Sequence, residues 1–159
     1  MKNAKEWIKK LNLEPHPEGG FYRQTDLSST NYERNGKKFP LYTNIYFLLT
    51  KESPSHFHQL SSDELWFYHG GNPLTVHSLN EDGGYEATIL GLEDGQHLHH
   101  TVVAGTIFGS TVDHGFALVS CIVVPGFDFK DFKLFSQKEL LKRYPKEREI
   151  ILKLAYEEI

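Results

Sequence analysis

The sequence predicts an all-β fold: one jelly-roll barrel, or double-stranded β-helix, with a short helix at each end of the chain. Between residues 21 and 125, short segments rich in β-branched and aromatic residues alternate with clusters of Gly, Pro, Asn and Asp. Eleven Phe and eight Tyr supply large side chains for the interior of such a barrel. A length of 159 residues fits one core, so we expect a single domain over residues 1–159.

The first expected element is a short helix over residues 3–11. Asn3 can cap it, and Trp7, Ile8 and Leu11 fall on one helical face. The run PHPEGG at residues 15–20 then brings two prolines and two glycines, which end the helix and force an irregular loop.

Eight strands are expected in the central region. They cover residues 21–26, 41–50, 64–69, 74–79, 86–90, 99–103, 106–112 and 116–124. Turn-forming clusters lie between them, among them Asn35-Gly36, Ser53-Pro54, Asp82-Gly83-Gly84 and Asp94-Gly95. Many short strands at this spacing are typical of a sandwich or a barrel.

The C-terminal region returns to helical spacing. Ser136 and Glu139 form a capping box just before Leu140. After Pro145, residues 146–158 are predicted to form a closing helix that lies on the barrel. Its apolar positions are Ile150, Ile151, Leu154 and Ala155.

Composition and charge exclude several classes of partner. The formal net charge of −4 leaves no electrostatic footprint for nucleic acid. No apolar signal-peptide core is visible near the N-terminus, and no stretch reaches the length of a membrane span. Cys121 is the only cysteine, so no disulfide can form within the chain. We therefore expect a cytoplasmic protein with no nucleic-acid or membrane partner.

The segment SHFHQLSSDELWFYHGG, residues 55–71, carries the strongest signal for chemistry. On an extended chain His56 and His58 point to the same side, and Glu64 follows on the next strand. This set suits a divalent metal such as zinc, nickel, iron or manganese, and it equally suits a general base with an orienting partner. An isolated pair of histidines at a strand end is more often idle, but Glu64 and the aromatic run after it argue against that alternative.

Alternation places Glu64, Trp66 and Tyr68 on one face of their strand. Two large rings exposed together would be unusual, so we expect this face to be the interior. A carboxylate there needs a partner or a shifted pKa, and the histidines before it are the nearest partners in sequence. We therefore expect Glu64 and His58 in one interior cluster with Trp66 or Tyr68, which would form an aromatic wall for a ligand.

The run HPEGGFYRQT, residues 16–25, offers a second set of polar groups. Glu18 supplies a carboxylate, Tyr22 a phenol, and Arg23 a guanidinium fork suited to phosphate or carboxylate. Two glycines let the backbone approach a ligand closely. A dimer contact or a strand-entry turn explains the same residues equally well, and both alternatives stay open.

The HxH pair, the glutamate and a glycine at strand end resemble the first motif of the cupin superfamily. The matching residues are His56, His58, Glu64 and Gly71, with one or two extra residues before the glutamate. In the second cupin motif Gly105 matches, but Phe108 stands where that motif has its metal-binding histidine. His99 is then the candidate substitute ligand. The resemblance therefore implies a metal that is held weakly or not at all.

Longer segments resemble a family of small, uncharacterised single-domain cupins. These segments are HPEGGFYRQT, SDELW, VVAGTIFGS and VSCIVVPGFDFKDF. Members of that family are similar in fold to the dTDP-4-dehydrorhamnose 3,5-epimerases, which implies a small-molecule ligand such as a sugar or nucleotide-sugar. Its usual first-motif features correspond here to His58, Asp63, Glu64 and Trp66, and His56 is an addition. Cupins of this size are often homodimers, and the strand at residues 21–26 is a plausible exchange element.

Three functions follow from these observations. The first is an isomerase or epimerase in which His58 is the base, Glu64 or Asp63 orients it, and Tyr68 returns a proton. The second is a metal-dependent enzyme, and the third is a binding module without catalysis. The second would use the metal set His56, His58, Glu64 and His99. The expected ligand contacts are Glu18, Tyr22, Arg23, Asp63, Trp66 and Phe108. Phe127, Phe129 and Phe132 are expected to pack the last strand on the barrel.

Overall fold

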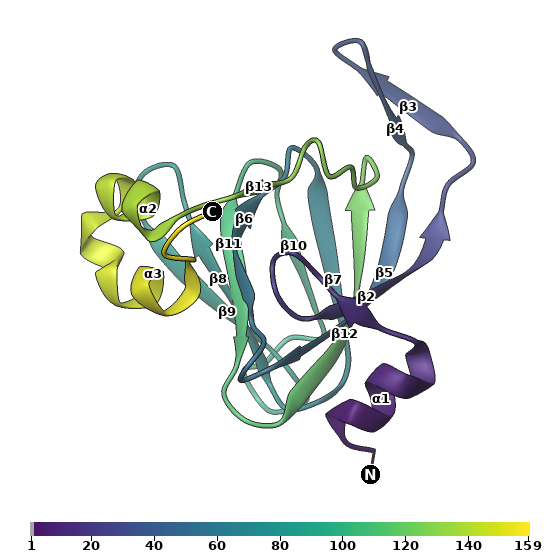
Figure 1. Ribbon diagram of the computed structural model, residues 1–159, viewed down its shortest axis with the longest axis horizontal. Coiled ribbons are helices and arrows are strands. Elements are labelled where there is room, and N and C mark those ends of the chain that lie inside the picture. Colours follow the sequence, from purple (N-terminus) through teal and green to yellow (C-terminus); the bar gives the residue numbers. More distant parts are fainter. Residues whose placement is uncertain (1) are drawn as a thin grey trace.

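The computed structural model describes residues 2–159, and two antiparallel sheets facing each other make up its body (Figure 1). The six-stranded sheet has the order β1 (Glu14–Pro15), β2 (Phe21–Leu27), β5 (Thr43–Thr50), β12 (Phe116–Val124), β7 (Asp63–Gly71) and β10 (His99–Val102). The five-stranded sheet has the order β13 (Lys133–Leu134), β6 (Ser55–Gln59), β11 (Ile107–Val112), β8 (Leu74–Leu79) and β9 (Tyr85–Leu90). The predicted all-β jelly roll is confirmed, with the sheets packed as a sandwich rather than hydrogen-bonded into a closed barrel.

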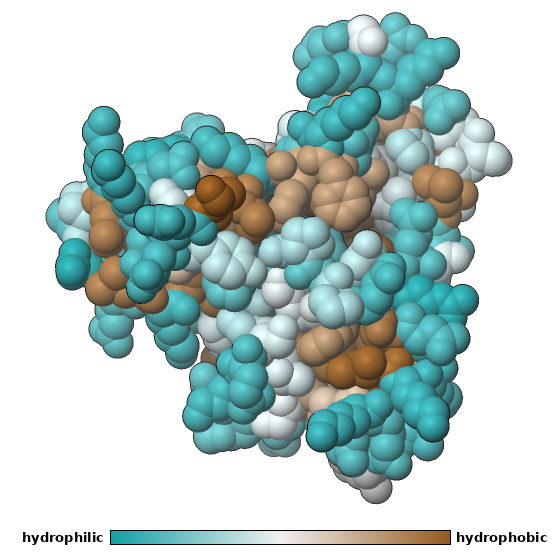
Figure 2. Space-filling model, viewed as in Figure 1, coloured by the Kyte–Doolittle hydropathy of each residue, from teal (hydrophilic) through white to brown (hydrophobic). Residues whose placement is uncertain are grey.

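A separate hairpin projects from the body in Figure 1. It consists of β3 (Asn31–Arg34) and β4 (Lys37–Pro40), joined by Asn35 and Gly36, which both have positive φ. Positive φ at both central residues is what a two-residue hairpin turn requires, and Asn-Gly supplies it. Figure 2 shows a largely hydrophilic tip and apolar surface where the hairpin joins the body.

The eight predicted strands are all present, with boundaries that differ by at most two residues. The prediction missed the short strands β1, β3, β4 and β13, and it treated β6 only as a conditional extended segment. These strands have two to five residues, and most of their side chains are exposed or polar. They therefore lack the apolar alternation that marks a strand in a sequence.

Helix α1 (Ala4–Leu11) begins at a capping box. The Asn3 side chain accepts a hydrogen bond from the Glu6 backbone N–H at 3.0 Å, and the Glu6 carboxylate accepts from the Asn3 N–H at 2.8 Å. These bonds satisfy backbone donors that have no partner inside the helix. Trp7, Ile8 and Leu11 pack against the outer side of the six-stranded sheet, as their spacing predicted.

Two C-terminal helices, α2 (Gln137–Arg143) and α3 (Arg148–Leu154), cover the outer side of the five-stranded sheet. Ser136 caps α2 in the predicted capping box. The single closing helix predicted for residues 146–158 is wrong at both ends. A 3-10 turn, Pro145–Glu147, precedes α3, and the chain is extended from Ala155 because Tyr156 pairs with Ser136. None of the helices within residues 2–159 is long and apolar enough to cross a bilayer.

Leu154 joins α3 to the sheet, and we predict that its truncation destabilises the protein. Leu154 is fully buried against a cluster that contains Phe57, Leu79 and Ile107. Replacing such a leucine with alanine leaves a cavity and lowers the free energy of unfolding by about 2–5 kcal/mol. Leu152, on the same helix, is 42% exposed. In urea denaturation Leu154→Ala should show this loss, while Leu152→Ala should stay close to the wild type.

Candidate functional site

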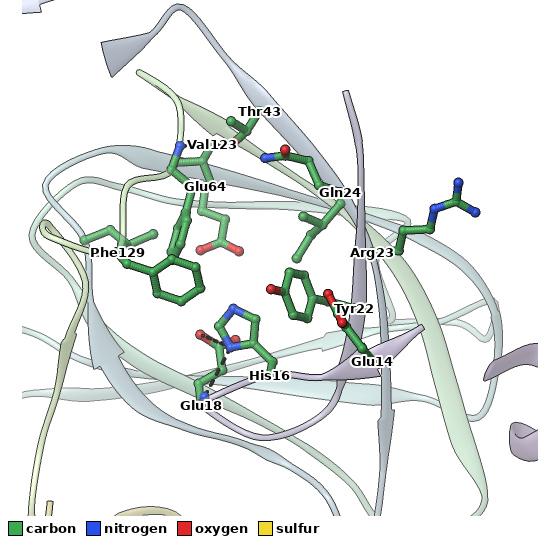
Figure 3. A pocket seen from close by; sticks show the side chains of 13 residues that line it. Glu14, His16, Glu18, Tyr22, Arg23, Gln24, Thr43, Glu64, Val123 and Phe129 are labelled. Carbon is green, nitrogen blue, oxygen red and sulfur yellow. Dashed lines mark hydrogen bonds and ion pairs between the residues drawn. The ribbon is translucent and has the colours of Figure 1, made fainter. Parts of the chain in front are cut away.

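A cavity of about 400 Å³ opens at one end of the sandwich (Figure 3). The inner face of the six-stranded sheet, the loop between β1 and β2, and the loop after β12 enclose it. The lining residues are Glu14, His16, Glu18, Tyr22, Arg23, Gln24, Thr43, Ile45, Leu60, Glu64, Val123, Phe127 and Phe129. Apolar walls with a few polar groups are the usual composition of a small-molecule site.

The loop between β1 and β2 is pressed onto strand β6 at the base of this cavity. The Glu18 carbonyl oxygen lies 2.7 Å from the His56 backbone nitrogen and 2.8 Å from His56 Nδ1, both of which donate to it. Gly19 has a φ of +101°, and a Cβ there would collide with the Pro54 carbonyl oxygen. A glycine is therefore required for the close approach. This docking carries the Glu18 side chain into the interior.

Glu18 and His58 form a buried pair beneath the cavity. His58 Nε2 lies 3.2 Å from Glu18 Oε2, and the exposed fractions of the two side chains are 1% and 7%. His58 Nδ1 lies 2.8 Å from the His56 carbonyl oxygen, which only accepts, so this nitrogen carries a proton. The Ser55 hydroxyl donates to Glu18 Oε1 at 2.9 Å.

Burial sets the charge state of both groups in this pair. It lowers the pKa of His58 to about 3, despite the hydrogen bond to the His56 carbonyl. Burial and the neighbouring Glu64 carboxyl raise the pKa of Glu18 well above its usual range, against the effect of the Ser55 hydrogen bond. Burial therefore favours the uncharged form of each group, a carboxylic acid beside a neutral imidazole.

Glu64 faces the cavity from β7 (Figure 3). It is 6% exposed, and burial raises its pKa to about 7, although a hydrogen bond from the Cys121 thiol opposes the shift. The thiol itself stays protonated, because burial and then the charges of Glu64 and Glu18 raise its pKa. Glu64 thus changes charge near neutral pH with only a weak donor beside it.

His16 lies at the centre of the cavity wall, and the sequence analysis did not select it. Its Nδ1 accepts the Glu18 backbone N–H at 3.1 Å, so the neutral ring carries its proton on Nε2. Burial lowers its pKa to about 4, so the 3.7 Å approach of Nδ1 to the Glu18 carboxyl is not an ion pair at neutral pH. Figure 3 shows the other ring nitrogen directed into the cavity.

Aromatic rings surround His16. Its ring centroid lies 4.6 Å from that of Tyr22 and 6.0 Å from that of Phe129, and Phe127 and Phe132 lie at 6.1 and 5.9 Å. Phe127, Phe129 and Phe132 belong to the loop after β12, which was expected to pack the last strand on the barrel. For Phe127 and Phe129 that expectation is wrong, because both line the cavity instead.

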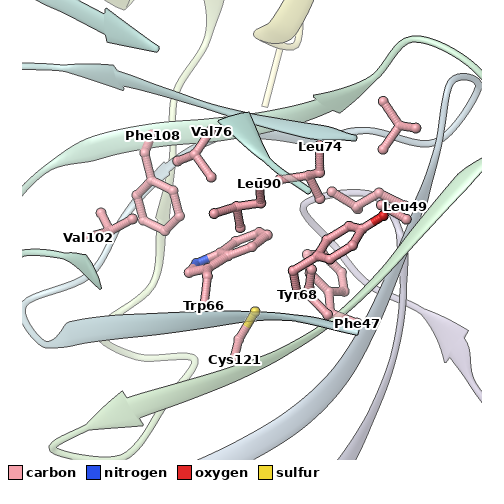
Figure 4. Close-up of a cluster of buried hydrophobic side chains, with 13 residues drawn as sticks. Phe47, Leu49, Trp66, Tyr68, Leu74, Val76, Leu90, Val102, Phe108 and Cys121 are labelled. Atoms are coloured by element: carbon pink, nitrogen blue, oxygen red, sulfur yellow. The ribbon is translucent and has the colours of Figure 1, made fainter. Parts of the chain in front are cut away.

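Several predicted contact residues lie in the core and do not line the cavity (Figure 4). Trp66 and Tyr68 share the inward face of β7 with Glu64, as alternation predicted. Trp66 is fully buried, and Phe108 packs between its ring and that of His58. The Tyr68 hydroxyl donates to the Gly71 carbonyl oxygen at 2.8 Å. The roles given to Tyr68 as proton donor and to Trp66 and Phe108 as ligand contacts are therefore wrong.

Asp63 and Arg23 also take structural rather than ligand-binding positions. The exposed Asp63 carboxylate accepts the Ala104 backbone N–H at 2.8 Å, because odd-numbered residues of β7 point outward. Arg23 borders the cavity, but its guanidinium is directed away from it and donates to the Leu11 carbonyl oxygen at 3.3 Å (Figure 3). Neither side chain presents its polar group to the cavity.

Sequence reasoning found Glu18, Tyr22, Arg23 and Glu64 as residues that line the cavity, and it missed others. Besides His16 and the loop phenylalanines, it missed Glu14, Gln24 and Thr43. Two signals in the sequence could have pointed to the missed residues: His16 is the first residue of the HPEGG run, and Phe127 and Phe129 alternate along the chain. No local pattern distinguishes an aromatic loop over a cavity from one that packs on a core.

A family model described as "Cupin superfamily (DUF985)" matches residues 5–135, which is most of the chain. This chain is a member of that cupin family. A curated relative, the uncharacterized protein YML079W of Saccharomyces cerevisiae, is 29% identical over 88% of this cupin and 79% of the relative.

Solved structures of similar proteins include two whole-chain matches. A hypothetical protein from Leishmania major has a TM-score of 0.93 and 42% identity over 98% of this cupin and 99% of that chain. Protein SO0799 from Shewanella oneidensis has a TM-score of 0.93 and 43% identity over 99% and 100% of the two chains. A variant of Bacillus subtilis oxalate decarboxylase matches with a TM-score of 0.58 and 14% identity over 91% of this cupin and 37% of that chain, which shows a shared fold alone.

Many cupins bind a metal ion, and the expected ligands here are His56, His58, Glu64 and His99. A metal site would require their donor atoms to converge. His56 Nδ1 donates a hydrogen bond to the Glu18 carbonyl oxygen. The His56 ring stacks on Tyr156, with ring centroids 3.9 Å apart. His99 is exposed on β10, opposite an outward residue of β7.

The predicted metal set is therefore wrong. Within residues 2–159, no three His, Cys, Asp or Glu side chains are grouped so that they could hold a metal ion. The position where the second cupin motif has its metal-binding histidine holds Phe108, whose ring packs on His58 with centroids 4.3 Å apart. In the described part of the chain, the donor atoms of His56, His58, Glu64 and His99 are not grouped as a metal centre would require.

Because Glu64 is buried, its ionisation should cost stability. Its pKa rises from the ordinary value of 4.5 to about 7 on folding, so the folded state holds the proton more tightly than the unfolded state. Stability should therefore fall as pH rises between those two values and level off above them, by a few kcal/mol. Glu64→Gln, which stays neutral, should lose this component.

The measurement is urea denaturation of both proteins across this pH range. The difference between variant and wild type isolates Glu64 from the buried histidines, whose lowered pKa values act in the opposite direction. Glu86→Gln, on the exposed side of β9, is the matched control and should keep the wild-type profile. A Glu64→Gln profile parallel to the wild type would contradict the assignment.

Proposed function

We propose that this cupin binds a small carbonyl compound in the cavity and transfers a proton at the carbon next to its carbonyl group, as an isomerase or epimerase does. The observation that carries the proposal is the Glu64 carboxyl. It faces the cavity, is buried, and has a pKa of about 7. A base is most effective when its pKa lies near the working pH.

Glu64, rather than the histidine suggested by the sequence, is the proposed base. The free lone pair of His58 is directed at Glu18 Oε2, and His58 does not line the cavity. The ionised Glu64 carboxylate removes the proton from carbon, and the electron pair of the broken C–H bond moves into an enolate. The Cys121 thiol donates a weak hydrogen bond that helps to hold the carboxylate in place.

An enolate needs a hydrogen-bond donor for its oxygen, and His16 is suited to that role. Its Nε2–H faces the cavity, and its low pKa keeps the ring neutral. A neutral imidazole can polarise a carbonyl and stabilise the developing oxyanion without losing its proton. The Tyr22 phenol and the Gln24 amide are further donors on the same wall.

Glu18 is the proposed acid that completes the transfer. Its carboxyl borders the cavity, and its Oε2 lies 3.2 Å from His58 Nε2. Donation of the carboxyl proton to the enolate at a second carbon, or at the opposite face of the same carbon, leaves Glu18 ionised and Glu64 protonated. Exchange with solvent then restores the starting state. Two carboxyls with separate proton states are the arrangement that acid–base chemistry at one site requires.

Hydrogen–deuterium exchange into carbonyl compounds tests this function. Ketones and aldoses with three to six carbons are incubated with the protein in deuterium oxide and followed by NMR. We expect exchange at the carbon next to the carbonyl, and a rate about 10²–10⁴-fold lower with Glu64→Gln. The rate should rise with pH and level off above about 7, because the base must be ionised.

Glu86→Gln is the control and should exchange like the wild type. Binding of a compound without any exchange would instead favour a module that binds small molecules and performs no chemistry. Exchange that persists in Glu64→Gln would reject Glu64 as the base.

We also propose that the protein is a homodimer. Apolar side chains gather on and beside the projecting β3–β4 hairpin: Leu27, Tyr32, Leu41 and Tyr42 are each at least 41% exposed. Exposed apolar clusters of this kind are common at interfaces. Light scattering at micromolar concentration should give twice the chain mass of 18.3 kDa. Leu41→Lys should shift the mass toward the monomer, and a monomeric wild type would contradict the proposal.

A further inference from the structure

We propose that the ligand of this cavity is a small organic cation, an amino-carbonyl compound rather than a phosphorylated or nucleotide-linked sugar. The inference rests on the proposed function in one respect only, the carbonyl group. The charge of the ligand follows from the cavity itself.

The cavity wall is acidic and offers no positive side chain. Three carboxyls line it, those of Glu14, Glu18 and Glu64. Arg23 is the only Lys or Arg among the lining residues, and Figure 3 shows its guanidinium directed away from the cavity. Within residues 2–159, none of the three carboxyls forms an ion pair with a lysine or arginine.

Among the lining carboxyls, Glu64 is the one whose ionised form most requires a cationic partner. It is only 6% exposed and is aimed into the cavity, and the Cys121 thiol beside it is a weak donor. A buried carboxylate is costly unless it is paired, and a strong partner for it is a charged donor. An ammonium group entering the cavity supplies both the charge and the N–H donors that the protein does not.

The aromatic walls favour the same kind of ligand. Tyr22, Phe127 and Phe129 line the cavity, and the ring centroids of the two phenylalanines lie 4.8 Å apart at an interplanar angle of 88°. Rings held at right angles present a face and an edge to a bound group. The negative face of an aromatic ring attracts an organic cation, most strongly where water is excluded.

His16 adds the requirement for an oxygen atom. Its neutral ring presents an N–H donor to the cavity, which suits a carbonyl or hydroxyl oxygen and contributes no charge that would attract an anion. A phosphate or diphosphate would instead face Glu14 and Glu64 without a cation or a helix N-terminus to balance it. The set of groups therefore selects a ligand that carries a positive nitrogen and an oxygen acceptor.

Three probes with the same six-membered ring isolate the effect of charge. They are cyclohexylamine, which is protonated, cyclohexanol, and cyclohexanecarboxylate. Binding is measured by ligand-observed NMR at about pH 8, where Glu64 is ionised. We expect the amine to bind about tenfold more tightly than the alcohol, and the carboxylate to bind more weakly than either.

Two variants and a control assign this preference to its source. Glu64→Gln should reduce amine binding to the level of the alcohol, and Phe129→Ala should weaken the amine more than the alcohol. Glu86→Gln should bind all three probes like the wild type. The proposal is overturned if the amine binds no better than the alcohol, if its advantage persists in Glu64→Gln, or if the carboxylate binds best.

These measurements read binding without turnover, so they separate the inference from the proposed function. A preference for the amine without proton exchange into any carbonyl compound would support the charge of the ligand and reject the catalysis. Exchange into neutral ketones without a preference for the amine would support the catalysis and reject the cation.

Discussion

The contact between Glu18 and His58 is the interaction on which the site depends. It joins the loop between β1 and β2 to strand β6 of the opposite sheet, across the mouth of the sandwich. Gly19 permits the close approach, and the His56 and Ser55 hydrogen bonds hold the loop in place. Without this docking the Glu18 carboxyl would remain in solvent and the cavity would lack its proposed acid. This contact therefore links the position of a loop to the chemistry of the interior.

Burial is the main influence on the charges of this interior. The two histidines and Glu18 are neutral because desolvation favours their uncharged forms. Glu64 alone stays poised near neutral pH, since it borders the cavity and lacks a strong donor. Holding such a carboxyl inside a protein costs stability, and a cost of this kind is typical of functional sites.

The cupin motif located the right region but assigned its residues to the wrong chemistry. Alternation correctly placed Glu64, Trp66 and Tyr68 on one inward face of β7. It did not predict where along the strand the packed core ends and the cavity begins. Trp66 and Tyr68 fall in the packed core, and Glu64 falls where the core ends and the cavity begins. The histidine pair suggested a metal because its members share a side of β6, but His56 lies at the strand end and binds backbone.

The sequence by itself determined most elements of this protein: eight of the strands, the Asn3 cap and the Ser136 capping box, the inward face of β7, and the glycines of the HPEGG run. These depend on local spacing and backbone preference, which short stretches of sequence encode. Only the tertiary structure decided that His16 and the phenylalanines after β12 line one cavity with Glu64, and that Glu18 meets His58. Those groups lie tens of residues apart, and their pKa values depend on how much water the assembled fold removes, which no local pattern records.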